Sequence, residues 1–148
     1  MHVRPATPAD VPVMMRLAQH SATAAQWSHE QYHRVFKSET PRRLALVIEE
    51  PAGVQGFLIA KQIAAEWELE NIAIAGPARR RGLGTRLLGE FLGQVRAQGA
   101  STVFLEVRES NRAARVLYEK WAFEETGRRV RYYHAPDEDA IVYSLAFV

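Results

Sequence analysis

The sequence predicts an α+β fold in which residues 1–148 form one domain. Two observations lead to this prediction. Apolar residues recur at a period of two in some stretches and of 3.6 in others, in the order strand, two helices, three strands, helix, strand, helix, two strands. The strand–helix–strand unit from Ile74 to Val103 also predicts one parallel, right-handed crossover. The result is a mixed central sheet of about seven strands with about four helices.

Length and composition exclude several classes of protein. A domain of this size buries about 70% of the surface of its unfolded chain, so it needs neither disulfides nor a metal to fold. The chain has no cysteine, which excludes a cysteine nucleophile, a thiolate zinc site and an iron–sulfur cluster. We find no signal-peptide pattern and no apolar stretch of membrane-spanning length. We therefore expect an unprocessed, cytoplasmic protein with no membrane partner.

Positive charge is concentrated at two places in the chain. The formal net charge is only +2, yet sixteen of the nineteen basic residues are arginines, grouped at 79–81 and 128–131. A general nucleic-acid binder carries a basic footprint over its whole domain, so we expect no nucleic-acid partner. A small anionic ligand fits the pattern better. For Arg128, Arg129 and Arg131 the simplest interpretation is a solvated face.

The first two elements are predicted from cap residues. Residues 2–6 form a short strand, and Thr7 then caps a helix with Pro8 at its first position and Asp10 at its third. The buried stripe of this helix consists of Val11, Met14, Leu17 and Ala18.

A second helix is predicted to begin at Ser28, where Gln31 completes a capping box. Trp27 is placed to pack against Tyr32, and the helix is expected to end near Ser38. The remaining elements are strands at 44–48, 56–63 and 67–74, a helix at 82–98, a strand at 102–108, a helix at 111–121, and strands at 124–132 and 140–146.

The turn after the third strand of the meander is the most informative stretch. Gly76-Pro77 ends the strand, and after three arginines Gly82-Leu83-Gly84 opens a helix. A helix start offers unpaired backbone N–H groups, and glycines allow an oxygen to approach them. The arginines at 79–81 add fixed positive charge, which suits a pyrophosphate. The spacing is neither a dinucleotide fingerprint nor a nucleotide phosphate loop, and a basic connection capped by glycine is the alternative interpretation.

A carboxylate, an asparagine and a tyrosine are expected to face one cleft. The carboxyl ends of two parallel strands, at 72–74 and 106–108, mark where an open sheet of this kind binds its ligand. Glu106 lies on the opposite strand face from its apolar neighbours, exposed to the cleft or paired with a cation. The candidate partners are Arg108, Arg112 and Arg115. Asn111 is the natural cap of the next helix, and Tyr118 belongs to the apolar stripe of that helix.

These motifs resemble the GNAT superfamily of acetyl-CoA-dependent N-acetyltransferases. The run from Arg79 to Gly84 looks like the pyrophosphate-binding motif of that family. Further similarity lies at Asn71–Ile74, Leu105–Asn111, Ala113–Glu119, Arg131–Tyr133 and Glu138–Ala140. These stretches look like the bacterial RimI-type enzymes, which acetylate the N-terminal alanine of a small-subunit ribosomal protein. The resemblance covers nearly the whole chain and is strongest from Asn71 onward.

The resemblance implies a fold in which splayed parallel strands form an acetyl-CoA cleft, without a metal. It implies cofactor-binding roles for Ile72, Ala73, Ile74, Arg79, Arg80, Arg81, Gly82, Leu83, Gly84, Thr85 and Asn111. Glu106 resembles the general base, and Tyr118 resembles the acid that protonates the leaving thiolate. Glu68 and Glu70 are rival bases, since they alternate onto one face of the strand that would line the cleft.

Two stretches depart from the family pattern. Gly76-Pro77 stands one place later than the usual proline, which affects the entry to the turn. Trp121-Ala122-Phe123 stands where a glycine commonly precedes the phenylalanine, which affects the loop after the helix.

The resemblance also implies the acceptor: a protein N-terminal α-amine, that of the N-terminal alanine of a small-subunit ribosomal protein. The alternative acceptors are a small-molecule amine and a lysine. The alternative to an enzyme is a module that binds CoA without catalysis. Trp27, Tyr132 and Tyr133 are candidates for gripping the substrate peptide, or they are packing aromatics. Without a cysteine or a serine nucleophile motif, direct attack in a ternary complex is favoured over an acyl-enzyme. We expect a monomer or weak dimer.

A hypothesis of another class comes from His29-Glu30-Gln31-Tyr32-His33, which matches the zinc hydrolase pattern His-Glu-x-x-His. The available third ligands are Glu49 and Glu50 in a strand. An exposed helix is the simpler interpretation.

Overall fold

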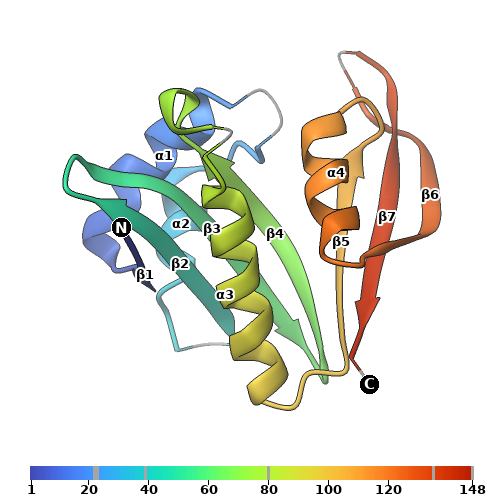
Figure 1. Cartoon of the computed structure of the whole chain (residues 1–148), viewed down its shortest axis with the longest axis horizontal. Coiled ribbons are helices and arrows are strands. Elements are labelled where there is room, and N and C mark those ends of the chain that lie inside the picture. Colours follow the sequence, from blue (N-terminus) through green and yellow to red (C-terminus); the bar gives the residue numbers. More distant parts are fainter. Residues whose placement is uncertain (22–23, 39, 80, 135, 148) are drawn as a thin grey trace.

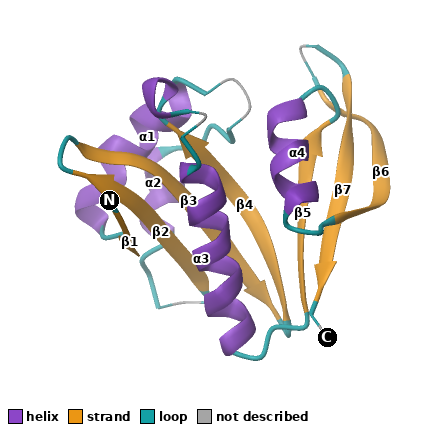
Figure 2. Ribbon diagram, viewed as in Figure 1, coloured by secondary structure: helices purple, strands orange, loops and turns teal. Residues whose placement is uncertain are grey.

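The computed structural model describes residues 1–21, 24–38, 40–79, 81–134 and 136–147. Figures 1 and 2 show the arrangement of its helices and strands. The strands are β1 (His2–Pro5), β2 (Arg43–Glu50), β3 (Gly53–Ile63), β4 (Glu66–Ile74), β5 (Thr102–Arg108), β6 (Glu124–Tyr133) and β7 (Glu138–Ala146). The helices are α1 (Val11–Gln19), α2 (His29–Arg34), α3 (Leu83–Ala97) and α4 (Arg112–Lys120), with short 3₁₀ turns at Pro8–Asp10 and Gly76–Ala78.

The strands form a seven-stranded sheet in the order β1-β2-β3-β4-β5-β7-β6. All neighbouring pairs are antiparallel except β4 and β5, which are parallel. The predicted α+β class and the parallel crossover through α3 are therefore confirmed. Helices α3 and α4 cover one face of the sheet, and α1 and α2 cover the other (Figure 1).

The parallel pair separates soon after it begins. Pairing joins Glu66–Glu68 of β4 to Thr102–Phe104 of β5 and goes no further. Beyond this point the two strands diverge, as Figure 1 shows. The facing backbone edges of β4 and β5 are then left without a strand partner, and an unpaired strand edge can bond a ligand.

A β-bulge at Glu70 accompanies this divergence. Ala60 of β3 pairs with Leu69, whereas its neighbour Ile59 pairs with Asn71, so Glu70 is the extra residue. Apolar side chains packed towards α3 are Trp67 and Leu69 before the bulge, and Ile72 and Ile74 after it. The spacing of three between Leu69 and Ile72 shows that the bulge reverses the alternation of the strand. Bulges bend and twist a strand, and here the bend turns the end of β4 away from β5.

The second predicted helix is shorter than expected. The capping box of Ser28 and Gln31 and the packing of Trp27 on Tyr32 are present, with ring centroids 5.5 Å apart. The helix nevertheless ends at Arg34 instead of near Ser38. After that point the amides of Val35, Phe36 and Lys37 donate to carbonyls three residues back, which is the bonding of a tight turn.

No helix in the described part of the chain is long and apolar enough to cross a membrane.

Candidate active site

The start of α3 has the geometry expected of an anion site. Gly82 caps the helix at φ 79°, a left-handed conformation that favours glycine. The first backbone hydrogen bond of the helix runs from the N–H of Arg86 to the carbonyl of Gly82, at 3.0 Å. The amides of Leu83, Gly84 and Thr85 therefore have no partner within the helix. Together with the helix dipole, these three amides can bind a phosphate oxygen.

The arginines before this helix differ in their positions. Arg79 lies at the site, and its Nε donates to the carbonyl of Ile74 at 3.3 Å. Arg81 instead forms a two-point ion pair with Glu50 of β2, with one N–O distance of 3.0 Å. Arg80 lies outside the described residues. Of the two described arginines, Arg79 is the one placed to meet a pyrophosphate.

A cleft of about 930 Å³ opens where β4 and β5 diverge. It is lined by most of the residues singled out from the sequence: Ile72, Ala73, Ile74, Arg79, Gly82, Leu83, Gly84, Thr85, Glu106, Asn111, Tyr118 and Tyr133. Trp27, Arg81 and Tyr132 do not line it. The expectation that the glycine turn, the strand-end carboxylate and the tyrosine share one cleft therefore agrees with the structure.

Glu106 lies in this cleft with an unexpected partner. Its side chain is 17% exposed, and one Oε lies 2.7 Å from Nε of Arg129 on β6. None of the candidate partners Arg108, Arg112 and Arg115 makes this contact. Arg129 is exposed, as a solvated face predicts, but it also pairs with Glu106. The hairpin of β6 and β7 places Arg129 within reach from another edge of the sheet. Arg108 pairs with Glu138, and Arg115 donates to Tyr143.

Tyr118 is buried on α4 and also borders the cleft. Its ring packs against Phe123 and Tyr143, with centroids 5.7 and 6.2 Å away. Burial raises the pKa of the Tyr118 phenol well above its ordinary value. The hydroxyl therefore keeps its proton over the neutral pH range and can serve as a proton donor.

The chain is similar to known proteins over most of its length. A family model described as the acetyltransferase (GNAT) family matches residues 12–123 of the chain. The chain belongs to this GNAT family. It is 35% identical over 138 residues to the ribosomal protein bS18-alanine N-acetyltransferase of Salmonella typhimurium, covering 92% of the chain and 90% of that relative. The corresponding Escherichia coli enzyme is 33% identical over the same coverage.

Solved structures agree with this assignment. The crystal structure of the Escherichia coli ribosomal-protein-S18-alanine N-acetyltransferase has a TM-score of 0.89 and 31% identity, covering 98% of this chain and 92% of that one. Arabidopsis thaliana NAA60, crystallised with acetyl-CoA, shares the fold at a TM-score of 0.87 and 16% identity, covering 99% of this chain and 98% of that one. The chain is thus an acetyl-CoA-dependent GNAT acyltransferase similar to the RimI-type enzymes, which confirms the prediction made from its motifs.

The rival carboxylates of the GNAT cleft are held by cations. Glu70 forms a two-point ion pair with Arg43, with N–O distances of 2.9 and 3.4 Å. Glu68 lies 3.4 Å from Nζ of Lys61, and it does not line the cleft. Glu68 lies in the segment of β4 that still pairs with β5, and Glu70 lies beyond that segment, so Glu70 alone of the two lines the cleft.

Asn111 has a structural role in addition to its place in the cleft. Its Oδ1 accepts a hydrogen bond from the N–H of Ala114 at 3.2 Å, which makes it the cap of α4. This bond fixes the start of the helix that carries Tyr118.

Sequence reasoning missed the wall of the GNAT cleft formed by the α1–α2 loop. Ser21, Ala24, Ala25 and Gln26 line it together with Asn71 of β4. These four loop residues carry no recognisable motif. Asn71 alone gave a signal, because an asparagine in a strand otherwise rich in apolar residues marks a polar position that needs partners.

The aromatic candidates lie in three different environments. Tyr133 lines the cleft beneath the guanidinium of Arg108, whose Cζ is 4.3 Å from the ring centroid. Tyr132 is 47% exposed and packs edge-on against Tyr133, with centroids 5.2 Å apart. Trp27 packs on Tyr32 instead of entering the cleft. Their substrate roles stay predictions, and Tyr133 has the position best suited to one.

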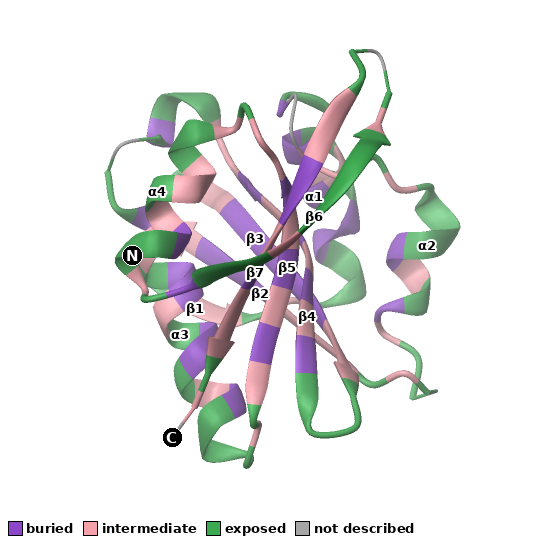
Figure 3. Cartoon of the chain, turned by 90° about the vertical axis from the view of Figure 1, so that its right-hand side faces the viewer, coloured by how far each residue is buried: buried purple, intermediate pink, exposed green. Residues whose placement is uncertain are grey.

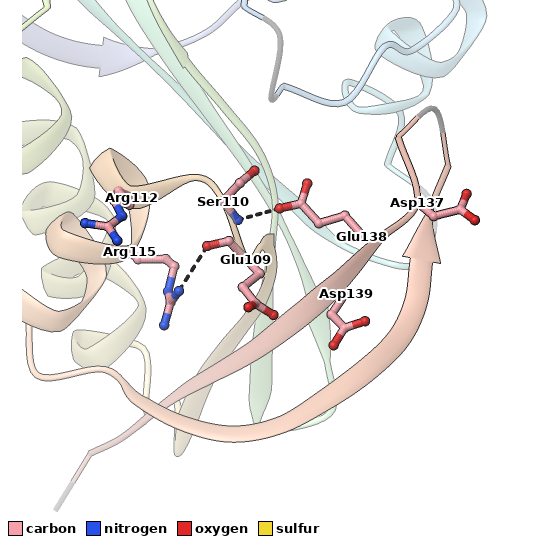
Figure 4. A pocket seen from close by; sticks show the side chains of 7 residues that line it. All are labelled: Glu109, Ser110, Arg112, Arg115, Asp137, Glu138 and Asp139. Atoms are coloured by element: carbon pink, nitrogen blue, oxygen red, sulfur yellow. Dashed lines mark hydrogen bonds between the residues drawn. The ribbon is translucent and has the colours of Figure 1, made fainter.

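A second pocket, of about 480 Å³, lies outside the cleft. Figure 4 shows its residues: Glu109, Ser110, Arg112, Arg115, Asp137, Glu138 and Asp139. Its carboxylates pair with cations outside the lining: Glu138 pairs with Arg108, and Glu109 and Asp139 both pair with Arg128. The Ser110 amide donates to Glu138, and Arg115 donates to the Glu109 carbonyl at 3.0 Å. This network ties the turn after β5 to the β6–β7 hairpin and so fixes the hairpin relative to Glu106.

The histidines of the zinc pattern lie together on α2. Nε2 of His29 is 3.2 Å from Nε2 of His33. The carboxylates considered as a third ligand are engaged elsewhere: Glu49 pairs with Arg4, and Glu50 pairs with Arg81. Among the described residues, no three potential ligands gather to hold a metal ion.

Proposed function

We propose that the chain transfers the acetyl group of acetyl-CoA to a protein N-terminal α-amine. The proposed substrate is the N-terminal alanine of ribosomal protein bS18, and attack occurs directly in a ternary complex. The observation that carries this proposal is the cleft between β4 and β5, which has an anion site at one end and both Glu106 and Tyr118 on its walls. The similarity to the bS18-alanine N-acetyltransferases supports the choice of acceptor.

The residues of the cleft fit acetyl-CoA. The free amides of residues 83–85 and the guanidinium of Arg79 would hold the pyrophosphate. The open backbone edge of β4 at residues 72–74 would pair with the amide groups of the pantetheine arm, much as a further strand would. When bound, acetyl-CoA supplies an acetyl group activated as a thioester.

Glu106 has the task of removing a proton from the amine. An N-terminal α-amine has a pKa of about 8, whereas lysine has one of about 10.4, so the α-amine needs much less help to reach its nucleophilic form at neutral pH. A carboxylate acting directly or through one water can provide that help. This difference favours an N-terminus over a lysine as acceptor.

Tyr118 has the complementary task of giving a proton to the leaving thiolate. A thiol of this kind has a pKa of about 8.5, and the ordinary tyrosine value is about 10. Burial raises the pKa of Tyr118, so the phenol carries its proton at neutral pH; because it is then a weaker acid than the thiol, it must donate while the carbon–sulfur bond breaks. In the complete reaction the new N–C bond replaces the C–S bond. The neutral amine loses one proton to Glu106, the thiolate gains one from Tyr118, and proton exchange through water returns Glu106 to the carboxylate and Tyr118 to the phenol. An amine that arrives as an ammonium releases one further proton to water.

The proposal is tested by acetyl-CoA turnover against a panel of acceptors. The panel consists of the N-terminal peptide of bS18, the same peptide with a blocked N-terminus and an internal lysine, and small amines. Because the chain has no cysteine, released thiol comes only from CoA. We expect turnover with the free alanine N-terminus and little with the other acceptors. Turnover of a small amine or lysine alone would overturn the choice of acceptor, and binding of acetyl-CoA without turnover of any amine would indicate a non-catalytic module.

Two conservative variants test the assigned roles. Glu106→Gln should lower kcat by about 100-fold or more, the usual effect of losing a general base, while acetyl-CoA affinity changes little. Tyr118→Phe should also lower kcat and leave the fold intact, because only the hydroxyl is removed. As a matched control, Glu68→Gln alters a carboxylate that does not line the cleft. Full activity of Glu106→Gln at pH 7 would disprove its role as the base.

A further inference from the structure

The partner of Glu106 is a cation that is far more exposed than the carboxylate itself. The Arg129 side chain is 58% exposed and that of Glu106 is 17% exposed. Arg129 belongs to β6, the exposed edge strand of the sheet (Figure 3). Its side chain reaches Glu106 of β5 across the intervening strand β7. Glu106 belongs to β5, which pairs with β7 along seven residues and is held in place by it. The guanidinium can therefore turn into solvent, whereas the carboxylate cannot follow it.

The contact between the two groups differs in geometry from the Arg43–Glu70 pair. The closest approach of Arg129 to Glu106 is made by Nε, at 2.7 Å. Arg43 approaches Glu70 with two nitrogens, and both of those side chains are well covered. In this same position the Cζ of Arg129 lies 5.1 Å from the ring centroid of exposed Tyr132. Cation–π contact with that ring can keep the guanidinium close by after it leaves Glu106.

We propose that Arg129 is an exchangeable counterion of Glu106, and that the ammonium of the acceptor amine displaces it. This inference rests on the proposed function, in which Glu106 receives the amine. A carboxylate this well covered is costly without a positive partner, so a free cleft needs a cation beside it. Exchange of a guanidinium for an ammonium keeps the net charge of the site constant. A neutral amide cannot make this exchange, so the device selects acceptors that carry a positive charge.

The exchange has a measurable consequence for acceptor binding. Partly exposed ion pairs contribute about 0.2–1 kcal/mol, which is roughly 1.5- to 5-fold in a binding constant. Competition from Arg129 should weaken binding of the acceptor to Glu106 by this factor. Arg129→Gln should therefore lower the KM for the peptide by roughly 1.5- to 5-fold, and kcat should change less than KM. Arg129→Lys keeps a competing cation and should restore the original KM to within a factor of about two.

A matched control is Arg131→Gln, which removes one positive charge from the same hairpin without touching Glu106. It should leave the KM for the peptide unchanged. A second measurement distinguishes competition for Glu106 from a general loosening of the β6–β7 hairpin. Calorimetry would compare the peptide affinity of the Glu106→Gln protein with that of the Glu106→Gln, Arg129→Gln double variant. If Arg129 competes for Glu106, adding Arg129→Gln should not raise the peptide affinity, because the carboxylate for which the two cations compete is absent.

Two results would overturn the inference. A higher KM in Arg129→Gln would mean that Arg129 binds the acceptor, and an unchanged KM would mean that the ion pair is not in competition. Either result would leave the proposed function intact as long as the free N-terminus is acetylated. Absence of turnover with every amine would end both proposals.

Discussion

The side-chain amide of Asn71 forms two hydrogen bonds with the backbone of Ala25, 46 positions earlier in the chain. Oδ1 of Asn71 accepts from the Ala25 N–H at 3.1 Å, and Nδ2 donates to the Ala25 carbonyl at 3.2 Å. Asn71 directly follows the bulge residue of β4, and Ala25 belongs to the loop between α1 and α2. One buried side chain therefore joins the strand that would carry the cofactor to the opposite wall of the cleft.

Replacing Asn71 should affect the acceptor side of the cleft more than the cofactor side. Asn71→Ala removes both hydrogen bonds and leaves two backbone groups of Ala25 in a partly buried place, at a cost of about 1–3 kcal/mol in the free energy of unfolding. The α1–α2 loop loses its attachment, so the KM for the peptide should rise while acetyl-CoA affinity stays the same. Urea unfolding and steady-state kinetics measure the two effects. An equal loss of cofactor affinity would show that Asn71 acts on the whole cleft instead.

The succession of strands and helices along the chain, the buried helix faces and the glycine turn at the start of α3 could be predicted because each has a local signal. The bulge at Glu70 had one as well, since Leu69 and Ile72 are three apart where a regular strand would place core residues two apart. The pairing of Glu106 with Arg129 had none. It depends on how the β6–β7 hairpin crosses the sheet, and three arginines nearer in sequence were equally reasonable partners. The residues of the α1–α2 loop likewise become a cleft wall only through tertiary contact.

Acid should remove the contribution of Asp10 to stability. Two nitrogens of Arg4 lie 2.9 Å from its carboxylate oxygens, and the Thr7 N–H donates to it at 2.8 Å. These bonds, with Arg4 the largest cause, lower the pKa of Asp10 from its ordinary value of 3.8. A lowered pKa in the folded state means that the stabilisation is complete above about pH 4 and is lost as the pH falls through the folded value.

Asp10→Asn should therefore destabilise the protein at pH 7 by about 1–3 kcal/mol, and the difference from the original chain should shrink below pH 3.8. Thermal unfolding between pH 2 and 7 measures this. Glu30→Gln serves as a control, because the exposed pair of Glu30 and Arg34 should contribute little at pH 7. If the stability difference between Asp10→Asn and the original chain were the same at all pH values, the loss would come from the geometry of the asparagine side chain and not from the missing negative charge.

Ala122 stands where the family commonly has a glycine before the phenylalanine. The loop after α4 still forms, but the backbone of Ala122 is strained. The amide of Ala122 donates to Glu119, and the amide of Phe123 donates to Tyr118, which is the bonding of a Schellman cap. Ala122 has a φ of 67°, a left-handed conformation that costs an alanine about 1 kcal/mol. Ala122→Gly should therefore stabilise the protein by about 1 kcal/mol in urea unfolding. At the end of α3 the same bonds surround Gly99, at φ 88°, so Gly99→Ala should destabilise it by a similar amount.

Alanine substitutions at Gly89 and Gly93 of α3 should have opposite effects on stability. A Cβ built on Gly93 has no neighbour within 4 Å, whereas one built on Gly89 lies 2.8 and 2.9 Å from ring atoms of Trp121. Replacing glycine by alanine inside a helix normally stabilises it by about 1 kcal/mol, so Gly93→Ala should raise stability. At Gly89 the clash costs about 1–3 kcal/mol and should cancel or exceed that gain.

The clash at Gly89 also has consequences for activity. Trp121 directly follows α4, so relief of the clash must move either the indole or the helix that carries Tyr118. Gly89→Ala should therefore lower kcat as well as stability, whereas Gly93→Ala should leave kcat unchanged. In a Trp121→Leu background the ring is gone, and Gly89→Ala should then recover the ordinary gain in stability of about 1 kcal/mol. If Gly89→Ala destabilises that background to the same extent, the close approach of α3 to Trp121 is not what requires a glycine at this position.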